Sequence, residues 1–179
     1  MINEAGADAL TLRGAAKRAG VSQAAPYRHF RNKDALLAAV AEEGFRAMAE
    51  AMERRAGPQR GDPAGRLRAL GLAYVEFATR HPAHVRVMFG RVSIDRAAHP
   101  GLQEAAAAAY GLLIGAIRDC QAAGVVRAGN PEDLALTAWS AVHGLSMLAV
   151  DGQLGERAGR LEPLAQAVTA DVVRGLTVG

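Results

Sequence analysis

Residues 20–33 read GVSQAAPYRHFRNK and combine basic and aromatic side chains with a proline and no acidic residue. The segment before it, residues 12–19 (LRGAAKRA), has small and apolar residues at helical spacing, and Thr11 and Gly20 are suited to cap its two ends. We therefore predict a helix over 12–19, a turn at 20–22, and a second short helix that Ser22 caps and that ends near residue 30. Such a pair of helices is a helix-turn-helix.

Pro26 lies inside the second predicted helix, close to the point where its first internal N–H bond would form. Because proline has no N–H and its ring crowds the preceding turn, it is tolerated only near the start of a helix. We predict a helix here despite the proline, and we expect the missing donor either to loosen this turn or to tighten it, for example into 3₁₀ geometry.

Charge is distributed unevenly along the chain. The segment from residue 13 to residue 33 contains no acidic side chain, whereas the other residues carry 15 basic against 18 acidic ones. A basic N-terminal module attached to a mildly acidic body predicts that one end of the molecule meets a polyanion. The six basic residues of the segment are Arg13, Lys17, Arg18, Arg28, Arg31 and Lys33.

Residue types in the second helix suit duplex DNA, because a helix-turn-helix places that helix in the major groove. Gln23 can form a bidentate pair with adenine, and Arg28 can reach guanine or a phosphate. Ala24 and Ala25 leave room for close approach to a thymine methyl group. The residues placed for backbone phosphates, which set register rather than sequence preference, are Tyr27, His29 and Lys33.

The rest of the chain reads as helices throughout, so we predict an all-α fold. Helices are expected from residue 33 or 34 to about 56, and near 64–80, 84–90, 100–123, 131–150 and 161–175. Residues 57–63 (GPQRGDP) hold two prolines and two glycines, which places a boundary between a helix-turn-helix domain over 1–56 and a helical body over 57–179. Ala107, Gly111 and Gly115 line one helix face and would permit a close helix contact.

Composition excludes several other classes. Half of the 179 residues are hydrophobic and only 4% are aromatic, which favours a helical core over a sheet. A single cysteine, Cys120, rules out an internal disulfide and fits a reducing cytoplasm. No signal peptide is recognisable at the N-terminus. The longest uncharged run, residues 134–150, is short for a membrane span and predicts a buried bundle helix.

The order of these residues resembles the DNA-binding signature of the tetracycline-repressor (TetR) family of bacterial transcription regulators. The likeness runs over residues 4–41, EAGADALTLRGAAKRAGVSQAAPYRHFRNKDALLAAVA. The matching positions are Gly6, Leu10, Thr11, Arg13, Ala16, Gly20, Val21, Ser22, Tyr27, His29, Phe30, Lys33, Leu36 and Leu37. The resemblance implies phosphate contacts by Thr11, Tyr27, His29 and Lys33. It implies base-facing positions for Arg13, Gln23, Ala24, Ala25 and Arg28.

Two segments of the body resemble the C-terminal regulatory domain with a Trp-His-Gly signature found in one branch of this family. They are FATRHPAHVRVMFG at 77–90 and the Trp139, His143 and Gly144 positions. The resemblance implies a cytoplasmic homodimer on a palindromic operator, usually a repressor, that releases DNA when a small molecule enters the C-terminal domain. We expect the helices near 131–150 and 161–175 to pair with their symmetry mates.

One departure from the family pattern concerns the first helix, which precedes the helix-turn-helix in family members. Here only residues 2–5 are available for its last turn. We therefore expect apolar surface on Ala16, Phe30 and Leu37 to lack a cover, and we expect the true start to lie upstream of Met1. The alternative function that follows is a dimeric small-molecule-binding protein that has lost DNA binding through truncation.

A ligand pocket in the body is a further expectation, mostly apolar and suited to an apolar effector. Its candidate lining residues are Met88, Phe89, Tyr110, Leu113, Trp139, His143 and Met147. Each is also an ordinary core residue, and Trp139 and His143 are one helical turn apart.

An enzyme is the third alternative, a small hydrolase or transferase that would use His143. We predict no catalytic residue, metal or cofactor, because His81 and His84 lack further ligands and no catalytic sequence motif is present. His143 on an apolar helix is instead typical of a hydrogen-bonded core histidine.

Overall fold

The computed structural model describes residues 10–90 and 94–177, and in these residues every regular element is a helix. The predicted all-α fold is confirmed. Packing divides the chain into two compact units. Unit 1 comprises the described residues within 1–46 and 81–107, and unit 2 those within 47–80 and 108–179. Helices α3 and α6 each contribute their first part to unit 1 and their second part to unit 2.

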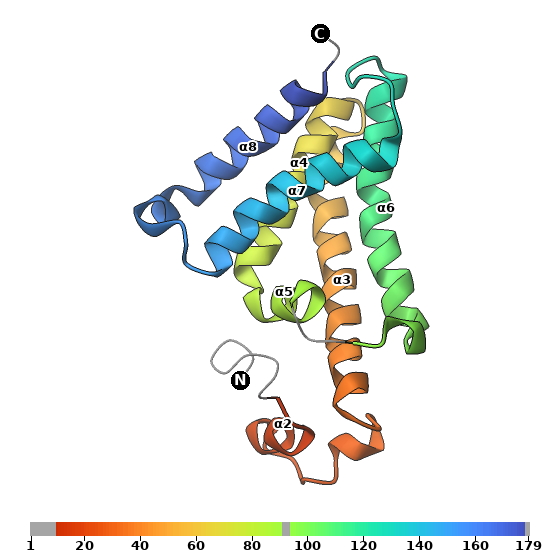
Figure 1. The fold of residues 1–179 in the computed structure, drawn as a ribbon, viewed down its shortest axis with the longest axis vertical. Helices are drawn as coiled ribbons and strands as arrows, with labels where there is room; N and C mark the ends of the chain where they lie inside the picture. The colour runs from red at the N-terminus through yellow and green to blue at the C-terminus, as the bar shows by residue number, and fades with distance from the viewer. Residues whose placement is uncertain (1–9, 91–93, 178–179) are drawn as a thin grey trace. The chain divides into compact units, whose positions relative to one another are not determined.

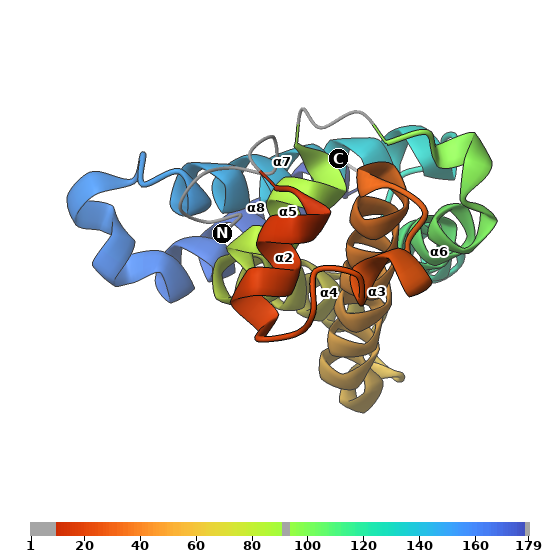
Figure 2. The ribbon, with the colours of Figure 1, turned by 90° about the horizontal axis from the view of Figure 1, so that it is seen from below.

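Unit 1 contains the predicted helix-turn-helix region (Figure 2). Its elements are α2 (Leu12–Ala19), the 3₁₀ turn η1 (Pro26–Arg28), the first part of α3 (Lys33–Ala56), α5 (Pro82–Phe89), η3 (Arg96–Ala98) and the start of α6 (Pro100–Ala122). Phe45 on α3 packs edge-on against Phe89 on α5, with ring centroids 5.3 Å apart. The Arg96 guanidinium lies 5.9 Å from the Phe45 ring centroid, which extends this cluster to the segment before α6.

The expectation of an uncovered apolar surface in unit 1 is wrong. Ala16 and Leu37 are each only 1% exposed, and Phe30 is half-buried. Leu10 and Leu12 are also buried, so apolar side chains around α2 contribute to the core of this unit. The apolar side chains of the helix-turn-helix region are therefore covered in unit 1, which also includes described residues from 81–107.

Unit 2 is a helical bundle in which α4, α7 and α8 pack against one another (Figure 1). Its elements are the second parts of α3 and α6, η2 (Gly57–Gln59), α4 (Pro63–Arg80), α7 (Pro131–Val150), η4 (Gly155–Arg160) and α8 (Leu161–Leu176). Gly71 on α4 is required for this packing, since a Cβ there would lie 2.8 Å from Thr169 Cγ2 and 3.3 Å from Val142 Cγ1. The predicted small-residue face at Gly111 and Gly115 makes no comparable contact among the described residues.

The observed helices match the predicted ones closely from residue 33 onward. Prolines at positions 63, 82, 100 and 131 each open a helix, because the first helical residue needs no N–H partner and proline fixes a suitable φ. The 3₁₀ turns at 96–98 and 155–160 had no clear sequence signal. The functional boundary at residue 56 stays a prediction, since the packing units group residues differently.

Among the described helices, α7 is long and apolar enough to cross a membrane. Only a third of its most apolar 18-residue stretch is buried in the structure. This is weak evidence, because core helices of soluble proteins share these properties. Within unit 2, α7 packs against α4 and α8.

Candidate nucleic-acid interface and regulatory core

Both predicted caps of α2 are present. The Thr11 Oγ1 accepts a hydrogen bond from the Gly14 N–H at 3.0 Å, which satisfies one of the free donors at the helix start. At the other end Gly20 has φ +69°, and the N–H groups of Gly20 and Val21 donate to the carbonyls of Lys17 and Ala16. This is the arrangement of a Schellman motif, which reverses the chain sharply after α2.

The second element of the motif differs from the predicted helix. It consists of a turn at residues 23–25 followed by one 3₁₀ turn, Pro26–Arg28, with Ala25 at the cap position. The predicted Ser22 side-chain cap is wrong: the Ser22 carbonyl accepts from the Ala25 N–H instead, at 3.0 Å. Because Pro26 cannot donate to that carbonyl, the i→i−4 pattern cannot begin there. Of the two expected effects of Pro26, a looser or a tighter turn, the structure has the tighter one, with 3₁₀ geometry.

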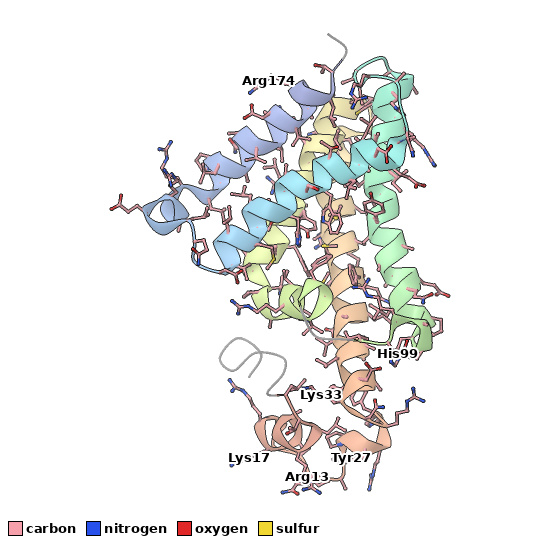
Figure 3. The ribbon with its side chains drawn as sticks, viewed as in Figure 1. Arg13, Lys17, Tyr27, Lys33, His99 and Arg174 are labelled. Atoms are coloured by element: carbon pink, nitrogen blue, oxygen red, sulfur yellow. The ribbon has the colours of Figure 1, made fainter. Side chains whose placement is uncertain are left out.

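None of the ten predicted DNA-contacting residues is buried. Ala25 and Lys33 are half-buried, and Tyr27 is one of the most exposed large hydrophobic residues of the described chain, at 52%. Arg13, Lys17 and Tyr27 extend from the part of unit 1 that α2 and η1 form, and Lys33 stands where α3 begins (Figure 3). The exposed members of the set are Thr11, Arg13, Ser22, Gln23, Ala24, Tyr27, Arg28 and His29.

Thr11 can serve the helix and a ligand at the same time. Capping uses one acceptor lone pair of its hydroxyl, and the O–H remains a donor. A phosphate oxygen is a suitable acceptor for that donor. The exposed Thr11 hydroxyl is therefore compatible with the phosphate contact that the sequence predicts.

At the start of α3, the polar side chains on either side of Lys33 form hydrogen bonds. The Asn32 Oδ1 accepts from the Ala35 N–H at 2.9 Å and so caps the helix. The Asp34 carboxylate contacts His99, with Oδ2 2.7 Å from Nε2, and Oδ1 accepts from the Asp95 N–H at 3.2 Å. The hydrogen bond from His99 is the main cause that lowers the pKa of Asp34.

In unit 2 the polar centre of the helical bundle is Tyr74 on α4, which is 4% exposed. Its hydroxyl lies 2.7 Å from the His143 Nδ1 and accepts a hydrogen bond from the Trp139 Nε1 at 3.3 Å. The Trp139 ring also contacts the Tyr110 ring on α6, with centroids 6.0 Å apart. We call Tyr74, Tyr110, Trp139 and His143 the aromatic cluster. It joins α4, α6 and α7 within unit 2.

Burial controls the protonation of this cluster. It raises the pKa of Tyr74 to about 12 and lowers the pKa of His143. Tyr74 is therefore a neutral phenol at neutral pH, and its O–H can donate to a neutral His143 Nδ1 while its oxygen accepts from Trp139. The prediction of His143 as a hydrogen-bonded core histidine is consistent with this geometry.

The structure groups the seven predicted pocket residues unequally. Tyr110, Leu113, Trp139, His143 and Met147 belong to unit 2, whereas Met88 and Phe89 belong to unit 1. Sequence reasoning missed Tyr74, the residue that Trp139 and His143 both contact. A signal was available, since a tyrosine in the apolar run of α4 must find a partner for its hydroxyl when buried.

The described residues contain no group of three or more His, Cys, Asp or Glu side chains that could hold a metal ion. His81 and His84 contact each other through their rings, with centroids 5.9 Å apart. Cys120 is completely buried, and burial raises the pKa of its thiol to about 11, so the thiolate that would react is suppressed.

Two family models and one curated relative match parts of this chain. Residues 67–172 match the family "Tetracyclin repressor-like, C-terminal domain", and residues 1–40 match "Bacterial regulatory proteins, tetR family". The class A tetracycline repressor from transposon 1721 of Escherichia coli is 60% identical over 42 residues. That stretch is 24% of this chain and 19% of the repressor, so the chain matches about a fifth of that relative's length.

Solved structures agree over nearly the whole chain. A Rhodococcus sp. RHA1 protein of unknown function is 34% identical, with a TM-score of 0.83 over 99% of this chain and 90% of that one. The TetR family transcriptional regulator PfmR from Thermus thermophilus, 20% identical, has a TM-score of 0.77 over 99% of this chain and 94% of its own. A tetR family regulatory protein from Rhodococcus RHA1, also 20% identical, shares the fold with a TM-score of 0.80 over 99% and 92%.

Fold, exposed basic segment and helix-turn-helix together are those of a DNA-binding transcription regulator. The chain belongs to the TetR family of bacterial regulatory proteins, whose members bind operator DNA as dimers and are typically repressors. The alternative of a dimeric small-molecule-binding protein that has lost DNA binding through truncation is not supported, because residues 1–40 match the N-terminal family model. The expected last turn of a first helix at residues 2–5 lies outside the described residues. Membership of the branch with a Trp-His-Gly signature stays a prediction.

Proposed function

We propose that this TetR family member is a small-molecule-responsive repressor that acts in the cytoplasm as a homodimer on a palindromic operator. The observation that carries the proposal is the acid-free segment 13–33, which folds around a capped helix and keeps its basic and polar side chains exposed, except for the half-buried Lys33. A surface of this kind matches the charge and hydrogen-bonding groups of a DNA backbone.

In the proposed complex the exposed turn and η1 enter the major groove. Gln23 and Arg28, both exposed, read base edges together with Arg13, while Ala24 and Ala25 allow the backbone to come close. Phosphate oxygens on either side accept hydrogen bonds from the remaining residues of the interface, Thr11, Ser22, Tyr27, His29 and Lys33.

Dimer formation through α7 and α8 is supported by apolar side chains that one chain leaves outside its core. Leu136 and Leu148 on α7 are 51% and 47% exposed. On α8, Leu164, Val168 and Val172 recur every four residues and are only half-buried. Two copies that pair these faces would remove this surface from water, and their recognition elements would reach half-sites about one DNA turn apart.

The aromatic cluster is the proposed effector-responsive part of unit 2. Its hydrogen bonds connect α4 with α7, and Leu113 and Met147 supply further apolar side chains in the same unit. A small, mostly apolar effector that competes for the Tyr74 hydroxyl would change how α4 and α7 pack. Coupling of this kind typically amounts to about 1–3 kcal/mol.

The first test is a salt titration of DNA binding with operator duplexes selected by the protein from a random pool. We expect affinity to fall steeply as salt rises, because each neutralised phosphate releases counterions. Lys33→Ala should weaken binding to selected and unselected duplexes alike and reduce the salt slope by about 1, since one phosphate is no longer neutralised. Tyr27→Ala should also weaken binding, and Arg80→Ala at the end of α4 is the matched control, with no expected change. Binding without salt dependence, or unaffected by Lys33→Ala, would refute the interface.

The effector can be sought with the protein's own fluorescence, because Trp139 is the only tryptophan of the chain and belongs to the cluster. Compounds that change Trp139 emission and release the selected duplex would support the proposal. Compounds that release DNA equally well from a Tyr74→Phe/His143→Gln variant would show that the effector acts elsewhere.

A further inference from the structure

An acidic residue directly follows the basic segment, at the point where α3 begins. Asp34 is the second residue of α3, and Lys33, its neighbour, is a proposed phosphate contact. A carboxylate beside a phosphate-binding lysine would oppose DNA unless it were neutralised or held away, since like charges repel. The contacts of Asp34 therefore matter for the interface.

Both oxygens of the Asp34 carboxylate are engaged within unit 1. Oδ2 lies 2.7 Å from the His99 Nε2, and Oδ1 accepts from the Asp95 N–H at 3.2 Å. The side chains of His99 and Asp34 are 17% and 29% exposed, so the pair is partly shielded from water. Asp95 and His99 flank η3, immediately before α6. The segment 95–99 thus holds the first turn of α3 through one carboxylate.

This tertiary contact differs from an ordinary helix cap. The N–H donors at the start of α3 already have the Asn32 side chain as a partner, through the 2.9 Å bond from Ala35. Asp34 is therefore not needed as the cap and makes a contact 65 residues away in sequence. Such a contact restrains the position of the first turn as a whole, which a local cap does not.

We propose that Asp34 and His99 form a positioning pair that holds the first turn of α3 so that Lys33 meets the DNA backbone. The pair also keeps the Asp34 carboxylate hydrogen-bonded within the protein. Neither residue contacts DNA itself. The inference rests on the proposed interface, because it assigns these residues a role through Lys33.

The test is a set of double-mutant cycles read by fluorescence anisotropy with a labelled duplex of about 30 base pairs, selected by the protein, and with an unselected duplex of the same length. Asp34→Ala and His99→Ala should each weaken binding about tenfold, and the double variant should lose no more than either alone. His99→Gln keeps an N–H donor at a similar reach and should stay within about twofold of the wild type. Arg80→Ala, which breaks the exposed pair with Glu76 on α4, is the control and should change nothing.

A second cycle separates positioning from general stability. In a Lys33→Ala background, Asp34→Ala should have little further effect on affinity or on the salt slope, because the contact that it positions is already absent. Additive losses in either cycle, or unchanged affinity in Asp34→Ala and His99→Ala, would overturn the inference while leaving the interface intact. Unchanged affinity in Lys33→Ala would overturn both. Circular dichroism establishes folding, and if Asp34→Ala does not fold, His99→Ala carries the test because it leaves α3 unchanged.

Discussion

Individual polar side chains in this regulator do more than their sequence context suggests. Tyr74 stands in an apolar helix and would pass as a core aromatic, yet its hydroxyl organises the contacts of Trp139 and His143. Thr11 caps α2 and still keeps a donor for a ligand. In both cases one hydroxyl combines a donor with acceptor lone pairs, so it can join two partners at once.

Removal of the Tyr74 hydroxyl should destabilise unit 2. Tyr74→Phe takes away the partner that the Trp139 N–H and the His143 Nδ1 share, and loss of a buried hydrogen-bond partner costs about 1–3 kcal/mol. Urea unfolding followed by circular dichroism measures the change. Tyr27→Phe removes the same atom at an exposed site and should stay within about 0.5 kcal/mol of the wild type. Equal stability of the two variants would contradict a structural role for the Tyr74 hydroxyl.

His143 should make folding sensitive to mild acid. Burial lowers its pKa below the ordinary 6.5, so the unfolded chain binds a proton at pH values where the folded protein does not. Its contribution to stability is therefore fully present above pH 6.5 and is lost as pH falls through the folded pKa. Unfolding free energies between pH 7 and pH 5 should fall more for the wild type than for His143→Gln. Parallel pH dependences of the two proteins would count against this assignment. Asp34 does not interfere in this range, because its pKa is lowered from the ordinary 3.8 and its stability contribution is lost only at lower pH.

Helices and turns differ in how directly the sequence specifies them. The spacing of apolar residues and the prolines at first helical positions predict the long helices. The recognition element is different, because Pro26 limits it to a turn and a single 3₁₀ turn where a helix to residue 30 was expected. The sequence also pointed to the wrong glycines for close helix packing. A Cβ would meet neighbouring side chains at Gly71, whereas nothing lies within 4 Å of one at Gly111 or Gly115.

The two kinds of helical glycine should respond oppositely to alanine. At Gly71 a Cβ would lie 2.8 Å from the buried Thr169 side chain, so Gly71→Ala should destabilise by about 1–3 kcal/mol through overpacking. At the exposed Gly111 nothing lies within 4 Å, and Gly111→Ala should stabilise α6 by up to about 1 kcal/mol. Thermal unfolding of both variants tests the assignment. Stabilisation by both would mean that α4 and α8 can separate without cost.

At the level of the assembled protein, the apolar surface of α7 and α8 needs a partner. Only a third of the most apolar part of α7 is buried in one chain. That same apolarity makes α7 resemble a membrane span in composition. Family membership and the regular apolar spacing on α8 favour a second copy as the partner.

Charged substitutions on the exposed apolar face of α7 should dissociate the proposed dimer. Leu136→Glu with Leu148→Glu would place two carboxylates per chain in the proposed interface, and the dissociation constant should rise at least about 100-fold. Analytical ultracentrifugation measures the association. Ala108→Glu adds a charge to an exposed site on α6 and should leave it unchanged. A dimer that withstands the double substitution would place the interface elsewhere, and a monomeric wild type would refute the dimer.

Local patterns were sufficient for the helical class, the caps of α2 and the exposed basic segment, because spacing, capping and charge act between residues close together in the chain. They also carried the resemblance to the TetR family. The tertiary structure alone decided the partners of Tyr74 and Asp34, since His143 and His99 lie 69 and 65 positions away from them in the sequence. It also decided that Gly71 meets Thr169. Such contacts arise only when helices pack, because the partner of a buried hydroxyl or carboxylate is chosen by geometry in space and leaves no pattern in the sequence.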